Sequence, residues 1–247
     1  MKTLIYSVVI IFFVQFQGIA QNTTQYNTIQ LASFNDGSAV LGADSQKLSS
    51  INVRTSRSLE GSPFYNDDWL PGIVLINNNL KSNRVQLRYD PYRNLVFFKE
   101  GDQFMALNNK FVTGFIIDKD NKKKFFKNGF ESDKNEISPY TFLRVLHDGK
   151  TKLVVHHRTY IRKSHTNAFA SGTVSDEFRH KEDYYLQTSK TENLKEIRLK
   201  KKDLFKHIDK KYHDRLESYA EKNDLDFGEE KGMSNILGYY EQLLTKK

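Results

Sequence analysis

The sequence predicts an α+β protein, in which a curved antiparallel β-sheet or partial barrel is followed by a C-terminal helical segment. Between residues 61 and 200, short apolar runs alternate with turn residues, as antiparallel strands and their connections do. After Lys202 the apolar residues recur every three or four positions, which is the period of a helix. The chain of 247 residues is 38% hydrophobic and 13% aromatic, which is enough for a packed core.

Residues 1–20 have the pattern of a secretory signal peptide. Lys2 supplies a positive charge, Leu4 to Val14 are almost entirely apolar, and small residues precede a cleavage point between Ala20 and Gln21. The apolar stretch is about half of the ~20 residues that a membrane span needs, so we expect a cleaved signal and not an anchor. The sequence therefore predicts an exported protein of the periplasm, the cell surface or the extracellular space, with no transmembrane segment in its mature chain.

Residues 21–60 form a polar N-terminal arm, rich in Asn, Gln, Ser and Thr, in which Asn35-Asp36-Gly37 is a turn signal. We expect this arm to be a peripheral hairpin or a partly ordered segment. The antiparallel β domain follows over residues 61–200. Short turns such as Asn128-Gly129 and Asp148-Gly149 favour hairpins, and connections this short exclude a parallel sheet.

Eight runs in this region read as strands, because β-formers alternate with polar residues between turn signals. They are Ile73 to Ile76, Arg84 to Tyr89, Leu95 to Lys99, Gln103 to Leu107, Phe111 to Ile117, Lys124 to Lys127, Thr141 to His147 and Lys152 to Ile161. Residues 162–183 are polar and charged, and we expect a long loop there. Tyr184 to Leu186 and Glu196 to Leu199 read as two last strands.

Residues 201–247 are expected to form C-terminal helices packed on the sheet. A break at Asp209 is expected to cap a second helix, and Asn223 to end it. The final helix carries one apolar stripe that we expect to pack in the core, although a dimer interface or a membrane surface fits the same pattern. Its residues are Met233, Ile236, Leu237, Tyr240, Leu243 and Leu244.

Composition limits the function classes. The absence of cysteine excludes disulfides, thiol nucleophiles and thiolate metal sites, and favours a bacterial envelope protein over a eukaryotic secreted domain. The net charge of +8 becomes +7 when Lys2 leaves with the signal, yet export and the lack of a nucleic-acid-binding motif argue against a nucleic-acid partner. Residues 195–215 hold nine basic against four acidic residues, and such a block is either a solvated face or a docking site for an anionic surface.

Several short motifs together resemble a family of secreted β-rich proteins of Bacteroidota-type bacteria, over residues 59–247. The motifs are Gly61-Ser62-Pro63-Phe64-Tyr65 with Trp69 and Gly72, then Leu87 to Tyr92, Tyr184 to Leu186, and Tyr239-Tyr240. The resemblance implies a lineage and an exported location, but no activity or site residues. Physically these residues are typical of turns and aromatic anchors, with Arg88 expected to pair with Asp90 or to lie over a ring.

Three histidines are the candidates for a metal site: His147, His156 and His157. His147 and His156 are expected to lie too far apart along a hairpin to share an ion. His156 and His157 are neighbours on one strand and should point to opposite faces. The spacing therefore predicts no metal site, and we expect no cofactor, because no phosphate loop, dinucleotide motif or calcium loop is present.

No set of residues in the sequence converges on a catalytic mechanism. Asp67-Asp68 beside Trp69 could be a carboxylate pair over a sugar platform, but adjacent acids in a turn are usually caps. Ser62 lacks the second glycine of a nucleophile elbow. The leading hypothesis is therefore an exported non-enzymatic envelope protein that binds another envelope component or has a structural role. The alternatives are a periplasmic carrier of an apolar ligand in the curved sheet, and an enzyme with an unrecognised site near His147, His156 or His157.

Overall fold

The computed structural model describes residues 27–29, 58–77, 80–100, 103–133, 136–164, 175–191 and 193–245. The signal peptide, its cleavage point at Ala20 and Gln21, and most of the polar arm lie outside the described residues. Within the part that is described, no helix combines the length and the apolar character that crossing a bilayer requires.

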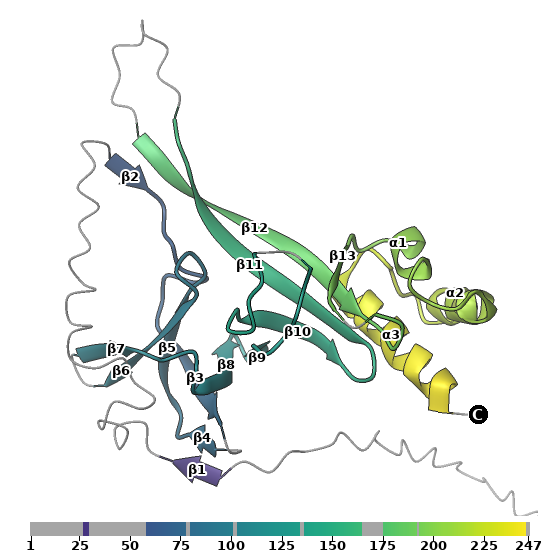
Figure 1. Cartoon of the computed structure of the whole chain (residues 1–247), viewed down its shortest axis with the longest axis horizontal. Helices are drawn as coiled ribbons and strands as arrows, with labels where there is room; N and C mark the ends of the chain where they lie inside the picture. The colour runs from purple at the N-terminus through teal and green to yellow at the C-terminus, as the bar shows by residue number, and fades with distance from the viewer. Residues whose placement is uncertain are drawn as a thin grey trace, which may run out of the picture.

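The architecture is a largely antiparallel, open β-sheet with a helical segment at the C-terminal end, as the sequence predicts (Figure 1). The main path of the sheet has the order β13-β12-β11-β10-β9-β8-β3-β5-β6-β7. The strands on this path are β3 (Leu70–Ile76), β5 (Val85–Asp90), β6 (Leu95–Glu100), β7 (Gln103–Ala106), β8 (Val112–Lys119), β9 (Lys122–Lys127), β10 (Leu143–Asp148), β11 (Lys152–Arg162), β12 (Ser175–Gln187) and β13 (Lys195–Ile197).

Three short strands extend the sheet away from this path. Strand β4 (Leu80–Ser82) pairs with β3, β1 (Asn27–Ile29) lies parallel to β4, and β2 (Ser58–Glu60) lies parallel to β12. The two parallel pairs correct the expectation that short connections exclude parallel pairing. Both use strands from the N-terminal arm, and the chain between each of them and its partner is long enough to cross over.

The long loop expected over residues 162–183 is also wrong, because residues 175–183 belong to β12. This strand is the longest in the described chain and pairs with β11 in an unbroken register from Lys152↔Gln187 to Arg162↔Glu177. Its first half is charged and contains no fully buried residue, so it lacks the apolar alternation that marks a half-buried strand. Cross-strand ion pairs contribute to holding this half, for example the one between Arg162 and Glu177, beside the ring contact of Phe178 with Tyr92.

The helices gather at one end of the β11–β12 hairpin, next to β13 (Figure 1). They are α1 (Lys201–Phe205), the 3-10 helix η3 (Lys210–Tyr212), α2 (His213–Lys222) and α3 (Glu230–Thr245). Asp209 does precede η3, but its side chain does not cap it, while Asn223 ends α2 as predicted. The apolar stripe of α3 is buried, with Met233, Ile236 and Leu237 at 0% exposure.

Two large apolar cores lie on the two sides of the β9–β10 pairing. One lies within the β3–β9 meander and includes Leu87, Phe98, Phe115 and Phe126. The other lies between the helices and the end of the β11–β12 hairpin near Leu153 and Leu186. It includes these two leucines and the apolar stripe of α3. The β9–β10 pairing between them is short, since its register covers only Leu143↔Lys127 and Arg144↔Phe126. Side chains near this seam make the candidate site.

Candidate functional site: a buried polar network and its pocket

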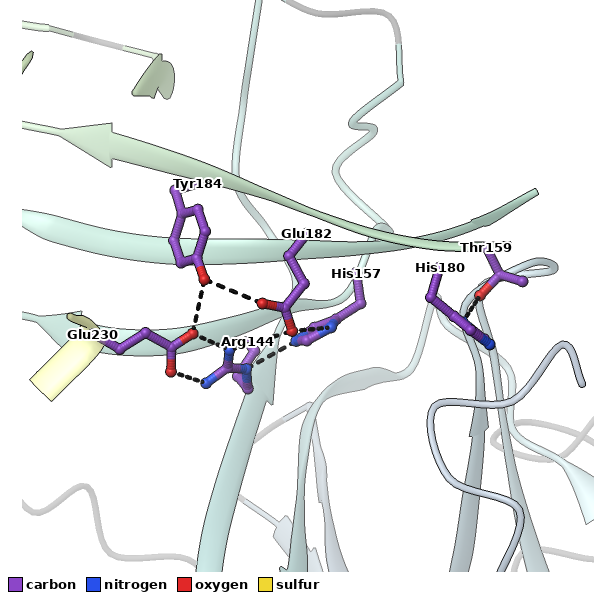
Figure 2. Close-up of polar contacts among 7 residues, drawn as sticks. All are labelled: Arg144, His157, Thr159, His180, Glu182, Tyr184 and Glu230. Atoms are coloured by element: carbon purple, nitrogen blue, oxygen red, sulfur yellow. Dashed lines mark hydrogen bonds and ion pairs between the residues drawn. The ribbon is translucent and has the colours of Figure 1, made fainter. Parts of the chain in front are cut away.

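Arg144 on β10 is the centre of a partly buried polar network (Figure 2). Its side chain is 5% exposed, and two of its nitrogens donate to the carboxylate of Glu230, with Nη1 to Oε2 at 2.8 Å and Nη2 to Oε1 at 2.5 Å. The third nitrogen, Nε, donates to Nε2 of His157 at 2.8 Å. Glu230 is the first residue of α3, where the helix dipole favours a negative charge. The network therefore ties the start of the last helix to the sheet.

The β11–β12 register supplies the other members. It places Glu182 opposite His157 and Tyr184 opposite Val155, so the three polar side chains share one face of the hairpin. His157 Nδ1 lies 3.2 Å from Glu182 Oε1. Because Nε2 accepts the hydrogen bond from Arg144, the neutral ring carries its proton on Nδ1, where it faces Glu182. The hydroxyl of Tyr184 lies 3.1 Å from both Glu182 and Glu230, and its single hydrogen serves one carboxylate at a time.

Burial and the Arg144–Glu230 pair set the protonation states of the network. Burial, reinforced by the positive charge of Arg144, lowers the pKa of His157 to about 3, so this histidine is neutral at pH 7. Burial alone would raise the pKa of Glu230, but the hydrogen bond and charge of Arg144 outweigh it and the pKa is lowered. Burial raises the pKa of Tyr184, and the negative charges of Glu230 and Glu182 add to this. At neutral pH the network is thus one arginine cation, one neutral histidine, one neutral tyrosine and two carboxylates.

A pocket of about 310 Å³ opens beside this network, and we call it the hairpin pocket. Tyr65 and Pro91 form one wall, and the hairpin forms the other with His157, Arg158, His180, Lys181 and Glu182. The ring of Tyr65 meets that of His157 edge-on at 4.7 Å, and His180 is held by a 2.9 Å contact between its Nδ1 and Thr159 Oγ1 (Figure 2). The pocket is therefore a polar recess with one aromatic wall, and its other wall is built on β11 and β12.

The three histidine candidates lie in different surroundings. His157 belongs to the network, whereas His156 faces the other side of the strand, is 7% exposed, and has no hydrogen-bond partner for Nδ1 within the described chain. His147 lies on β10, with Nε2 at 3.2 Å from Glu241 of α3. Among the described residues, no group of three or more His, Cys, Asp or Glu side chains could hold a metal ion. The structure brings only His157 to the candidate site.

The remaining candidates lie elsewhere. Asp67 and Asp68 are exposed, and Trp69 beside them is half-buried. The hydroxyl of Ser62 accepts a hydrogen bond from the amide of Phe64 two residues later, as in a turn. Arg88 lies over the ring of Phe64 at 3.6 Å, while Asp90 bonds to Arg93. Of the two expectations for Arg88, the contact with a ring is therefore confirmed.

A second, more open depression of about 520 Å³ lies among the helices. Lys200 and Lys201 line one part of it, Glu217, Glu221, Asp224 and Asp226 another, and Leu225 and Phe227 are among its apolar residues. Lys201 and Glu217 form a 3.5 Å ion pair with each other. The depression therefore carries both signs of charge and offers no single recognisable chemistry.

Sequence reasoning missed the network that Arg144, Glu182, Tyr184 and Glu230 form with His157. Arg144 and Glu230 are separated by 86 positions, and no local pattern signals such a contact. The hairpin did contain a usable signal, because pairing residues 175–187 with β11 would have placed Glu182 beside His157. Comparison with protein-family models, with curated proteins and with solved structures finds no match to this chain.

Proposed function

We propose that this protein is an exported, non-enzymatic binding module of the bacterial cell envelope, and that the hairpin pocket recognises a polar group of its ligand or partner. The observation that supports this most is the state of the chemical groups beside the pocket. Arg144, His157 and Glu230 satisfy one another in a buried network. Groups already paired in this way are suited to holding a recess rigid and poorly suited to taking a proton from a substrate.

The pocket itself has the composition of a recognition site. Its volume of about 310 Å³ suits a small polar group, and Tyr65 offers a ring against which such a group can pack. His180 and Lys181 are exposed at its rim. Lys181 pairs with Asp183 at 2.7 Å and His180 Nδ1 contacts Thr159, which leaves His180 Nε2 and the other donors of the Lys181 ammonium for a ligand. Charged and polar residues line both described depressions, which favours a polar ligand over the apolar ligand that the sequence allowed. A carrier of apolar molecules is therefore the less favoured proposal.

The pocket proposal is tested by binding and turnover measurements on the mature chain. The protein is screened by thermal shift against amino acids, dicarboxylates and soluble oligosaccharides, and hits are measured by calorimetry. We expect at least one class to bind, and His180→Ala and Lys181→Ala to weaken it at least tenfold. Tyr160→Ala is the control, since Tyr160 is 48% exposed and does not line the pocket. Turnover of an ester, glycoside, peptide or phosphodiester that His157→Gln abolishes would overturn the proposal.

The exported location has its own test. The full chain is expressed in a Gram-negative host, and the mass of the protein in the periplasm and medium is measured. The proposal requires a mature chain that starts at Gln21. An intact N-terminus retained in the cytoplasm would contradict it, whatever the pocket binds.

An anionic surface is a second candidate partner, and one observation favours it. Within the basic block of residues 195–215, five exposed cations have no ion pair in the described chain: Lys200, Lys202, Lys210, Lys211 and Arg215. Each cation near an anionic bilayer contributes about 1 kcal/mol. Co-sedimentation with phosphatidylglycerol vesicles should therefore be salt-sensitive and should fall when Lys210 and Lys211 become Gln. Equal binding to uncharged phosphatidylcholine vesicles would rule this candidate out.

A further inference from the structure

Three groups of the hairpin pocket keep hydrogen-bonding capacity that the protein does not use. The side chain of Glu182 is 45% exposed, and its contacts with His157 and Tyr184 leave free some of the roughly four acceptor sites of a carboxylate. Nε2 of His180 has no partner in the described chain, since only its Nδ1 makes a contact. The hydroxyl of Tyr65 has none there either, and burial raises its pKa, so it stays protonated at neutral pH. The pocket therefore offers one acceptor and two groups that both donate and accept.

The formal charges around the network balance. On the face of the hairpin that carries the network (Figure 2), Glu182 and Glu230 are opposed by Arg144, which bonds to Glu230 and lies 3.8 Å from Glu182. Lys124 of β9 is a second cation, and its positive charge acts on both Glu230 and His157. Two cations therefore stand against two carboxylates, and this face has no excess charge with which to select an ionic ligand.

The charges on the opposite face of the hairpin balance as well. Arg158 and Lys181 line the pocket, but Asp183 lies 2.7 Å from Arg158 Nε and 2.7 Å from Lys181 Nζ. Glu136 adds a second carboxylate, at 2.9 Å from Arg158. A ligand carboxylate or phosphate would have to compete with these acids for the two cations. A neutral oxygen, in contrast, can accept from the remaining donors of the Lys181 ammonium.

Two tyrosine rings lie along the network face of the hairpin. Tyr65 forms a wall of the pocket together with Pro91. The next residue, Tyr92, is 44% exposed and meets the ring of Phe178 edge-on at 5.5 Å. Phe178 shares a face of β12 with His180, because the two residues are two positions apart on the strand. The Tyr92–Phe178 pair therefore continues the pocket along the hairpin, and offers a flat surface for the apolar side of a ligand.

We propose that the hairpin pocket binds one neutral sugar residue of a glycan, and that Tyr92 packs against the neighbouring sugar residue. Sugar hydroxyls both donate and accept, so they suit Glu182, Tyr65 and His180 together, while the C–H face of the sugar packs against the Tyr65 ring. An apolar ligand would desolvate Glu182 without giving it a donor, and an ionic ligand would find no free counter-charge. The volume of about 310 Å³ is near the lower end for small-molecule sites, which limits the pocket to one ring. This inference rests on the proposed recognition role of the pocket and names its ligand class.

The test titrates the mature protein with the methyl glycosides of glucose, galactose, mannose and N-acetylglucosamine, and follows the NMR shifts of the His180 ring. We expect at least one glycoside to bind with a dissociation constant of about 0.1 to 10 mM, as a ligand of one ring allows. The uronic acid and the amino sugar of the same configuration should bind at least threefold more weakly. Raising the salt from about 20 to 300 mM should change the affinity less than twofold, because no net charge is involved. The corresponding disaccharide should bind at least threefold more tightly, and Tyr92→Ala should remove only that gain.

Protein variants locate the sugar. Glu182→Gln replaces an acceptor oxygen by a donor and should weaken glycoside binding at least fivefold. Glu136→Gln is the matched control, because this carboxylate is 53% exposed and pairs with Arg158 on the opposite face, and it should leave binding unchanged. Tyr65→Phe keeps the ring that packs against His157 and removes only the hydroxyl. It should weaken binding at least threefold at an unchanged melting temperature.

The failure of this inference is distinguishable from the failure of the pocket proposal. If an amino acid or a dicarboxylate shifts the His180 ring saturably and no glycoside does, the ligand class is wrong while the recognition role stands. If no compound of any class shifts that ring, both fail. Glycoside binding that Glu182→Gln and Tyr65→Phe both leave unchanged would place the sugar elsewhere and overturn the inference. An affinity that falls steeply with salt would show that charge selects the ligand, and would overturn it too.

Discussion

The charge of Arg144 depends mainly on one partner. Its side chain is 5% exposed and its main counter-charge, Glu230, belongs to another element. Removing one member of a buried ion pair leaves the other charge desolvated and unpaired, which costs more than the pair contributes as a whole. Glu182 lies 3.8 Å from Arg144 and 45% of its side chain is exposed, so it offsets only part of that loss.

We therefore expect Glu230→Gln to lower the free energy of unfolding by about 2 to 3 kcal/mol, measured by urea denaturation at pH 7. The matched control is Arg84→Gln, which breaks the pair with Asp118 where the arginine side chain is 55% exposed. That change should cost less than about 1 kcal/mol. Equal small losses in both variants would mean that Arg144 is better solvated than the structure indicates.

The two histidines of β11 make stability depend on pH. Burial lowers the pKa of His157 to about 3 and that of His156 to about 4, whereas an unfolded histidine titrates near 6.5. Between these values the unfolded chain binds protons that the folded chain does not, so acidification favours unfolding. The stability is fully present above pH 6.5 and is lost as the pH falls. The lowered pKa of Glu230 adds a loss only below its unfolded value of 4.5.

We expect the free energy of unfolding to fall by about 2 to 4 kcal/mol between pH 7 and pH 5. His157→Gln should reduce this slope, because the glutamine does not titrate, while His156 should keep the remaining part of it. His180→Gln, a change at an exposed residue on the same hairpin, should keep the wild-type slope. A wild-type stability that is constant from pH 7 to pH 5 would show that both rings accept protons in the folded state.

For single residues, the sequence predicted which face of a strand a side chain points to, but not which other side chains it contacts. That His156 and His157 face opposite sides follows from the two-residue period of a strand, and the structure confirms it. The network around His157 draws residues from β10, β12 and α3, and their meeting depends on tertiary packing. For Arg88 the sequence predicted one of two contacts, with Asp90 or with an aromatic ring. The structure shows the ring contact, and the ring is that of Phe64.

Among the secondary-structure elements, α3 is bound to the sheet along its whole length. Besides Glu230, the hydroxyl of Ser234 donates to the carbonyl of Leu146 at 2.7 Å, and Glu241 accepts from the amide of Thr151 at 2.7 Å. The first turn of α3 packs closely against the backbone of Asp226. A Cβ on Gly232 would lie 2.0 Å from the carbonyl oxygen of Asp226, so a side chain does not fit at this position. The helix is therefore part of the fold, in agreement with the core-packing reading of its apolar stripe.

We expect a chain that ends at Gly232, or the variant Leu237→Asp, to be poorly soluble or to melt far below the wild type. Leu237 is 0% exposed, so a carboxylate there loses the apolar contacts and is desolvated, at a cost of about 4 kcal/mol or more. Domains of this kind have only about 5 to 15 kcal/mol in total. Gln242→Asp, at an exposed position of the same helix, is the control and should melt within a few degrees of the wild type. A truncated chain with an unchanged melting temperature would refute the prediction.

The strands that sequence reasoning found differ in one physical respect from the first half of β12, which it missed. Each of the eight strands predicted in the meander and in β10 and β11 carries apolar side chains to a core, and this alternation is visible in the sequence. The first half of β12 is held by its backbone ladder with β11 and by cross-strand ion pairs such as Arg162–Glu177. Backbone bonds and ion pairs do not require apolar residues at alternate positions. The sequence therefore predicted a charged loop where the structure has a strand.

For the whole molecule, the open question is whether the two cores unfold together. The β9–β10 register joins the two sides of the sheet through only two residue pairs. Side chains strengthen this seam, since Tyr65 packs against both Phe126 and His157, and the hydroxyl of Tyr89 reaches the carbonyl of Phe142 at 3.4 Å. Tyr65 itself is fixed to β5 by the 2.9 Å bond from its amide to the carbonyl of Tyr89. These contacts favour a single cooperative unit.

Two signals report on the two sides separately. Trp69, the only tryptophan, is on the meander side, while the described α-helices, which dominate circular dichroism at 222 nm, all follow residue 200. We expect both signals to change at the same urea concentration. Leu243→Ala, a 5% exposed position in α3, should cost about 2 to 4 kcal/mol and lower both midpoints equally, although Trp69 lies in the other half. If the Trp69 midpoint stayed at its wild-type value, the seam would be a boundary between two independent domains, and damage to the helices would leave the β3–β9 meander folded.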